Sequence, residues 1–364
     1  MSVSSLPFLH GALAAVLPKL AAWRRDFHAH PEAGWTEFRT AALIIRRLRE
    51  LGYAIRMGEA ACASDRRMGV PSSAVLAAAR ERALEHGADA ELVAGMGDGY
   101  TGFWADLDCG PGPVTAFRFD MDCNEVAECA EESHRPVREG FASRWPGLMH
   151  ACGHDGHAAV GLGLAEVLVS IRRHLRGRIR LIFQPAEEGA RGALPMSEAG
   201  AVDGVDVLFG FHIGFKAEGP GSLICGTQGF LATTKRDVLF SGVPAHAGAA
   251  PEEGKDALLA ACSAVVNLHA ISRNGKGGTR IAVGRLEGGE ARNVIPASAR
   301  LFMETRGETT ELDAYMTAES ERILRASADL WGCACEWRTV GNSAGGGSSP
   351  ELARLIATVA EAMG

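Results

Sequence analysis

The sequence predicts an α/β protein of two domains, in which a large domain with a partly parallel sheet is followed by a smaller α+β module. Three observations point to this fold class. The chain has 364 residues, whereas one domain usually has about 100–200. Short buried-strand patterns alternate with helical patterns up to about residue 226. After that point the order of patterns becomes β-α-β-β-α-β, which is typical of a ferredoxin-like module.

The first part of the chain alternates helices with strands. Apolar residues at helical spacing predict helices that end near residue 27 and that cover residues 35–51, 72–94 and 155–174. We expect Gly52 to stop the second of these helices and Asp155 to cap the last. Short apolar runs predict strands at 101–107, 114–120, 178–184 and 205–211.

The second part carries the elements of the smaller module. Strands are predicted at 235–241, 280–286, 299–306 and 335–340, and helices at 256–271 and 311–330. Residues 341–349 read as a Gly/Ser linker, and Pro350 begins a last helix. We therefore expect a first domain over 1–228, an inserted module over 229–340, and a returning segment of the first domain within 341–364.

Composition narrows the function classes. The formal net charge of −7 argues against nucleic-acid binding, which needs a basic surface. The sequence contains no run of about 18 apolar residues, which is the length that would predict a membrane span. The first 20 residues lack a basic start and show helical spacing, so they predict an amphipathic helix instead of a signal peptide. Nine scattered cysteines indicate a reducing compartment, and we expect a cytoplasmic enzyme.

The strongest chemical signal is the eight-residue segment from His150 to His157. It contains three His, one Cys and one Asp, and it lies between a loop and a predicted helix start. Cys152 and His154 are two residues apart, so a thiolate and an imidazole can bind the same metal centre from one turn. The flanking glycines let the backbone bend around an ion. The alternative interpretation is a polar loop with a buried cysteine.

A second signal is the pair Glu187-Glu188, directly after a predicted strand. Neighbouring carboxylates point in different directions, so one can bind a metal while the other faces a bound water and acts as general base. The alternative is a solvated acidic turn.

Polar residues also close two other predicted strands. Asp120 and Asp122 lie at the end of one strand, and His212 follows another. Carboxylates at the end of an apolar strand are costly unless they are paired, whereas a lone His there is more often a satisfied core residue. Together with the His150–His157 segment and the Glu pair, these residues would gather at the carboxyl edge of one sheet.

The smaller module contributes two weaker signals. His246 and Asn293 each lie in a turn between strand-like segments. Surface turns alone account for polar residues at such positions.

Taken in order, these blocks resemble the metal-dependent amidohydrolase and peptidase family that includes glutamate carboxypeptidase, hippurate hydrolase and the indole-acetyl-amino-acid hydrolases. The resemblance extends from about Leu20 to the end of the chain. Within the family, the similarity is greatest to the p-aminobenzoyl-glutamate hydrolases. The segments that carry this closer similarity are 23–28, 34–40, 133–136 and the insert before Tyr100 with residues 67–71.

The resemblance implies a mixed-sheet, zinc-peptidase-like catalytic domain with an inserted ferredoxin-like lid and dimerisation domain. It implies an enzyme that cleaves an amide between an aryl or acyl group and an amino acid, with p-aminobenzoyl-glutamate as the expected substrate. Two divalent metal ions, Mn²⁺ or Zn²⁺, would be the cofactors. The assembly would be a homodimer or a hetero-oligomer with a related subunit.

The same resemblance implies roles for residues that match the family's motifs. Cys152 would bridge the two metals, His154 would bind one of them together with Glu188, and His212 would bind the other. Glu187 would be the general base toward a metal-activated water. The remaining roles fall to four residues. Asp122 would orient the metal ligands, and Asp120 would support them at a position where related peptidases have a His ligand. His246 would polarise the scissile carbonyl across a dimer. Asn293 would hold the substrate near its carboxylate.

One departure from the family pattern supports an alternative. The family's last His ligand lies near its C-terminus, and no His follows His269 in this sequence. We therefore expect either a truncated chain that turns over slowly or an inactive accessory subunit of the same family. Two further alternatives are a hippurate-like N-acyl-amino-acid hydrolase and a thiol hydrolase using Cys152 with His154, although the latter leaves the Glu pair unused.

Overall fold

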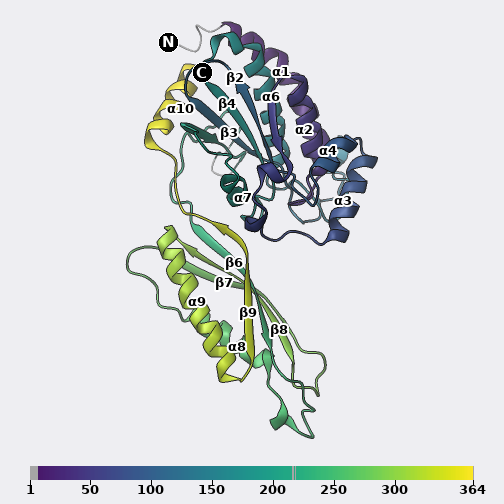
Figure 1. The fold of residues 1–364 in the computed structure, drawn as a ribbon, viewed down its shortest axis with the longest axis vertical. Helices are drawn as coiled ribbons and strands as arrows, with labels where there is room; N and C mark the ends of the chain where they lie inside the picture. Colours follow the sequence, from purple (N-terminus) through teal and green to yellow (C-terminus); the bar gives the residue numbers. More distant parts are fainter. Residues whose placement is uncertain (1–6, 215–216, 218, 364) are drawn as a thin grey trace. The chain divides into compact units, whose positions relative to one another are not determined.

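The computed structural model describes residues 7–214, 217 and 219–363. These residues form two compact units (Figure 1). Unit 1 comprises the described residues up to Ile224 together with those from Leu355 onward, and unit 2 is Cys225–Arg354. The sequence-based boundaries lay at 228/229 and 340/341.

Unit 1 is built on a mixed five-stranded sheet with the order β1-β2-β4-β3-β5. Strands β3, β4 and β5 run parallel, whereas β1 and β2 pair antiparallel. The bounds are β1 Ala54–Met57, β2 Phe103–Asp108, β3 Val114–Asp120, β4 Arg178–Gln184 and β5 Val207–Gly210. This sheet confirms the predicted α/β class, and β3 and β4 begin and end at the predicted residues. Strand β1 was not predicted, because its four residues carry too short a pattern.

The helices of unit 1 pack against this sheet and against one another. Helix α6 contacts β3 and β4, and α1 and α2 contact α6 (Figure 1). Stacked rings of Phe103 and Phe183, 4.9 Å apart, lie in the core between helices and sheet. The bounds are α1 Pro7–Ala29, α2 Phe38–Glu50, α3 Ser73–Glu85, α4 Ala90–Gly95, α5 Arg135–Arg138, α6 His154–Ser170 and α7 Ala193–Glu198.

Two helix starts differ from the prediction. Helix α2 begins at Phe38 instead of residue 35, because Trp35 adopts a left-handed φ of 69° that a helix cannot contain. The prediction that Asp155 caps α6 is wrong, since Gly153 precedes the helix with φ 96°. Asp155 lies within the first turn instead, where its Oδ1 accepts the Gly156 N–H and its Oδ2 binds His28 Nδ1, each at 2.8 Å.

Unit 2 is a four-stranded antiparallel sheet with the order β7-β8-β6-β9, covered by α8 and α9. Its β-α-β-β-α-β order confirms the ferredoxin-like module. The bounds are β6 Ala232–Ser241, α8 Ala257–His269, β7 Thr279–Gly288, β8 Ser298–Gly307, α9 Thr310–Leu330 and β9 Ala334–Ser343. Asp256 caps α8 as predicted, because its carboxylate accepts the Leu259 N–H at 2.9 Å. A separate core with Phe240 and Leu301 lies between sheet and helices.

The last helix, α10, spans Pro350–Met363. None of the helices in the described part of the chain combines the length and the apolar character that crossing a bilayer requires. All nine cysteines are free.

Candidate metal centre

The parallel strands of unit 1 deliver polar residues to one edge of the sheet. Because β3, β4 and β5 run in the same direction, the segments after Asp120, Gln184 and Gly210 leave the sheet at the same side. The start of α6 lies at this edge too, since the His154 ring bonds the residue Asp122 just past β3. Three strand ends and one helix start therefore form the site, in agreement with the sequence, which placed the His150–His157 segment before a helix and the other polar residues at strand ends.

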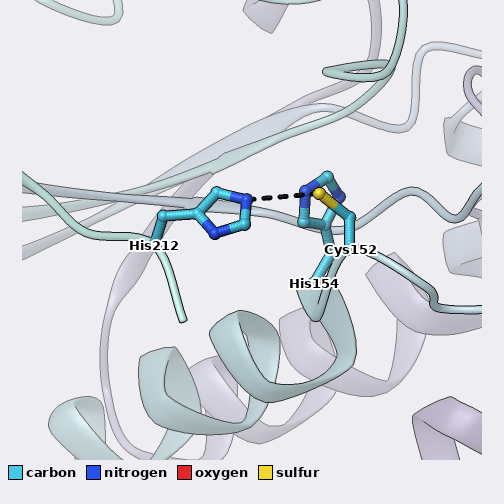
Figure 2. A group of neighbouring side chains, drawn as sticks. All are labelled: Cys152, His154 and His212. Atoms are coloured by element: carbon cyan, nitrogen blue, oxygen red, sulfur yellow. Dashed lines mark hydrogen bonds between the residues drawn. The ribbon is translucent and has the colours of Figure 1, made fainter. Parts of the chain in front are cut away.

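Cys152, His154 and His212 form the first group (Figure 2). Figure 2 shows the His212 ring directed at the Cys152 sulfur, with the His154 ring beside it. The Cys152 Sγ lies 3.3 Å from His212 Nε2. The three ligand atoms lie within 4.8 Å of one another, although the residues are up to 60 positions apart.

The His154 ring is fully buried and has a defined orientation. Its Nδ1 donates to the backbone carbonyl of Asp122 at 2.8 Å, so Nε2 is the nitrogen that faces the site. That Nε2 lies 3.8 Å from Glu187 Oε2 and 4.0 Å from Glu188 Oε1. The sequence-predicted Glu pair and the His150–His157 segment therefore meet at this point.

The donor atoms fit a bound cation. His154 Nε2 and Glu188 Oε1 are buried, and neither has a hydrogen-bond partner among the described residues. Two donors that share one metal lie about 3–4 Å apart, because each metal–ligand bond is about 2.0–2.3 Å. A cation between these atoms would satisfy both, and the thiol of Cys152 and the imidazole of His212 add two further donors of the kind that bind divalent metals.

Asp122 contacts two members of this set. Its Oδ2 accepts the Glu188 N–H at 2.9 Å, and its Oδ1 lies 3.4 Å from His154 Nδ1. The Asp122 side chain is fully buried. Asp122 therefore orients the imidazole of His154 through its backbone carbonyl and fixes the backbone of Glu188 through its carboxylate.

Asp120 is buried as an ion pair. Its carboxylate bonds Arg118 Nη1 at 2.5 Å and the Nδ1 of His157. Burial alone would raise the pKa of Asp120, but the His157 hydrogen bond and the charges of Arg118 and His154 outweigh it and lower that pKa. Asp120 is therefore a paired carboxylate at neutral pH.

His157 is a buried residue of this site to which the sequence analysis gave no role. Its Nε2 accepts the Ile213 N–H at 2.9 Å, and its Nδ1 donates to Asp120. Both ring nitrogens are thus occupied, so the cluster of Asp120, His154 and His157 does not offer three free donors. His157 instead fixes the backbone next to His212. Its place in the His150–His157 segment was the sequence signal that marked it.

Glu187 lies at the rim of the site, with 38% of its side chain exposed. Burial raises the pKa of Glu187. The charge of Arg118 lowers this pKa, whereas the charge of Asp122 raises it further. A carboxylate with a raised pKa at the rim of such a group of side chains is suited to accept and return a proton.

His246 and Asn293 lie in unit 2, on two segments joined by backbone hydrogen bonds. His246 bridges to Val294, and the Ala247 N–H donates to the Asn293 carbonyl at 3.0 Å. The His246 Nδ1 accepts the Gly248 N–H at 3.1 Å, which leaves the ring proton on Nε2. The structure thus brings these two predicted residues together, and it brings the other seven together in unit 1.

The profile of peptidase family M20/M25/M40 matches residues 116–364, which is more than half of the chain. The chain belongs to this family. The resemblance predicted from the sequence is thereby confirmed, and membership places the chain among peptidases and amidohydrolases that cleave amide bonds.

Two named relatives align with nearly the whole chain. An indole-3-acetyl-aspartic acid hydrolase of Enterobacter agglomerans is 46% identical over 95% of this chain and 79% of its own length. A p-aminobenzoyl-glutamate hydrolase chain of Escherichia coli, named as one subunit of that hydrolase, is 47% identical over 93% of this chain and 77% of its own.

Two solved structures share the fold. An aminobenzoyl-glutamate utilization protein from Klebsiella pneumoniae has a TM-score of 0.83 and 41% identity, covering 95% of this chain and 81% of its own. The Bacillus subtilis YXEP protein, a dinuclear metal binding peptidase of the M20 family, has a TM-score of 0.56 and 26% identity, covering 91% and 76%.

Proposed function

We propose that this chain hydrolyses the amide bond between an aromatic acyl group and an acidic amino acid. One observation supports this substrate class above others. Two relatives at nearly equal identity, 46% and 47%, are named for indole-3-acetyl-aspartic acid and p-aminobenzoyl-glutamate. Both compounds join an aromatic acyl group to an amino acid with a side-chain carboxylate. The first candidate substrate is p-aminobenzoyl-glutamate, and indole-3-acetyl-aspartate is the second.

Cys152, His154, Glu188 and His212 would hold two divalent cations. The meeting of their ligand atoms at one sheet edge, and the unpartnered His154 Nε2 and Glu188 Oε1, support this assignment. Bound cations of this kind would supply Lewis-acid activation of water and of the amide carbonyl. The thiol and imidazole donors favour Zn²⁺, while the carboxylate suits Mn²⁺, so both metals are candidates.

Glu187 would move the proton during hydrolysis. It takes a proton from the attacking water and returns it to the amide nitrogen as the C–N bond breaks, so that the free amine leaves neutral. Its raised pKa and its place at the rim support this role. Asp122 and Asp120 would keep the ligands oriented, as their contacts with His154, Glu188 and His157 indicate.

His246 and Asn293 would bind the substrate from unit 2. Their adjacent segments support a joint role, in which His246 Nε2–H stabilises the carbonyl oxygen and Asn293 lies near the substrate carboxylate. The family resemblance supports a dimer in which His246 acts on the partner's site. The Escherichia coli relative is named as one subunit of its hydrolase, which supports the alternative of a related partner chain. Free cysteines support a cytoplasmic location.

The deciding experiment measures release of the amine from p-aminobenzoyl-glutamate, indole-3-acetyl-aspartate and hippurate by the purified chain loaded with Mn²⁺ or Zn²⁺. We expect kcat/KM to be highest for the two acidic substrates. We expect Glu187→Gln to lower kcat by about 10²–10⁴-fold with its metal content unchanged. A preference for hippurate would contradict the substrate class.

The same assay separates the other hypotheses. Activity that survives a chelator but not Cys152→Ser would indicate a thiol hydrolase. Activity that appears only with a co-expressed related chain would indicate an accessory role for this chain.

A further inference from the structure

The turn that carries Glu187 has an unusual backbone. Ala186 is fully buried and adopts a left-handed φ of 47°, a conformation that residues with a Cβ rarely take. Such a conformation persists only where its surroundings hold it in place. The position of the proposed general base therefore depends on the contacts that hold Ala186.

The peptide group in front of Ala186 is held by a side chain from far away in the sequence. Ala186 N–H donates to Glu37 Oε1 at 2.8 Å, across 149 positions of the chain. The other oxygen, Glu37 Oε2, accepts the Thr101 hydroxyl at 2.5 Å. Glu37 and Thr101 are both fully buried, so water does not compete for these hydrogen bonds.

The segment that carries Glu37 also packs around Ala186. A Cβ on Gly34 would lie 2.9 Å from the Ala186 Cα, so only glycine permits this approach. Trp35 and Cys62 complete a small apolar cluster with Ala186. The segment Gly34–Glu37 thus supplies both a wall and a hydrogen-bond acceptor for the turn.

The far side of Glu187 is held independently. The Glu188 N–H donates to Asp122, and Arg191 Nη2 donates to the Glu188 carbonyl at 2.8 Å. The Ala186 carbonyl also accepts the N–H groups of Arg191 and Gly192, at 3.1 and 3.0 Å, so the peptide that follows Ala186 is held as well. Loss of the Glu37 contact would instead leave the buried Ala186 N–H without its acceptor and let the Pro185–Ala186 peptide turn, which moves Ala186 out of its left-handed conformation. We expect that change to displace the Glu187 carboxylate, whereas Glu188 stays held through Asp122 and Arg191.

We propose that Glu37 is a positioning residue, which holds Ala186 in its left-handed conformation and thereby aims Glu187 at the reacting water. This inference rests on the proposed function only in the role of Glu187. The contact between Glu37 and Ala186 is independent of that role, so exchange of the Ala186 amide hydrogen and catalysis can be tested separately.

Two variants and a matched control test the proposal. Glu37→Ala removes the acceptor, while Glu37→Gln keeps it, because Gln Oε1 can accept from Ala186 and its amide can donate to the Thr101 oxygen. Glu32→Ala is the control. Glu32 is a buried carboxylate just before the segment Gly34–Glu37. It accepts the backbone N–H groups of Arg39 and Thr40, so its side chain bonds α2 instead of the turn.

We expect Glu37→Ala to speed hydrogen exchange of the Ala186 amide by at least about tenfold in the metal-loaded chain. We expect kcat on p-aminobenzoyl-glutamate to fall by about 10²-fold, with KM and metal content unchanged, because a displacement of about 1 Å has this effect on catalysis. Glu37→Gln should keep the slow exchange and restore kcat to within about threefold. Glu32→Ala should lower stability while the Ala186 exchange stays slow.

Three results would overturn the proposal: unchanged exchange at Ala186 in Glu37→Ala, unchanged kcat in that variant, or an equal change in both quantities in Glu32→Ala. If Glu37→Ala does not fold, Thr101→Val replaces it. That variant removes the hydroxyl that orients Glu37, and unchanged exchange and kcat there would overturn the proposal equally. A wild-type chain that is inactive on all three substrates would count against the proposed function, and the exchange result alone would then decide the role of Glu37.

Discussion

Cys152 and His154 must each lose a proton before they can bind a metal. Burial raises the pKa of the Cys152 thiol to about 12, and the carboxylates of Glu188 and Glu187 add to this effect. For His154, burial favours the neutral ring, but Asp122 and the neighbouring carboxylates raise the pKa to about 9. The metal-free site therefore holds two protons near neutral pH that a cation must displace.

We predict that metal binding releases about two protons per chain at about pH 7.5. Isothermal titration of the metal-free chain with Mn²⁺ or Zn²⁺, in buffers of different ionisation enthalpy, measures this number. Affinity should rise as the pH rises toward 9, because His154 then loses its proton unaided. Heats that do not depend on the buffer would contradict the prediction.

Glu37 also carries a pH-dependent contribution to stability. Burial and the charge of Asp122 raise its pKa from 4.5 to about 8, against the hydrogen bonds from Thr101 and Ala186. The folded chain thus holds a proton that the unfolded chain releases above pH 4.5. The contribution of Glu37 to the free energy of unfolding is therefore complete below about pH 4.5 and is lost as the pH rises through about 8.

We predict that the metal-free wild type loses stability relative to Glu37→Gln between about pH 6 and about pH 9. Gln keeps the hydrogen bonds but does not titrate, so the difference isolates this one carboxyl group. Urea-unfolding midpoints of both chains at the two pH values provide the measurement. Parallel pH dependences would show that Glu37 is ionised throughout.

At the scale of elements, glycines let α6 approach its neighbours. A Cβ on Gly161 would lie 2.7 Å from the Phe183 ring and 3.0 Å from Phe119, both in the core of the sheet. Gly11 in α1 offers a contrast, because a Cβ there would meet nothing within 4 Å. Substitution of glycine by alanine should therefore lower stability at one of these positions and raise it at the other.

We predict that Gly161→Ala lowers the free energy of unfolding by about 1–3 kcal/mol through overpacking. Gly11→Ala should raise it by about 0.5–1 kcal/mol, because Ala loses less conformational entropy in a helix. Urea unfolding of the wild type and the two variants tests whether each free energy of unfolding changes in the expected direction. A stabilised Gly161→Ala would show that the sheet side of α6 has room for a methyl group.

The sequence predicted those elements whose signal is local. Strands β3 and β4 were found to the residue, because each is a short apolar run that ends in polar residues. Asp155 was misassigned because Asp is a common cap, and only the folded chain brings His28 to its carboxylate from 127 positions away. Glu37 and His157 received no role for the same reason, since their partners Ala186 and Ile213 lie 149 and 56 positions away.

At the scale of the whole molecule, the proposed metal ligands all belong to unit 1. They follow β4 and β5 or lie at the start of α6, so a bound cation would tie together segments that separate on unfolding. Unit 2 has its own core and contributes none of these ligands. Metal binding should therefore stabilise one cooperative unit and leave the other unchanged, and the chain should not unfold in a single two-state transition.

We predict two transitions in differential scanning calorimetry, of which a chelator shifts only one. Free metal at about 100 times its Kd stabilises the folded unit by about 2.7 kcal/mol, which raises its Tm by about 5–10 °C. The variant Phe240→Ala identifies the other transition, because Phe240 is fully buried in the core of unit 2 and its truncation costs about 3–5 kcal/mol there. If metal shifted both transitions equally, or if Phe240→Ala lowered the metal-sensitive one, the two cores would have to unfold as one.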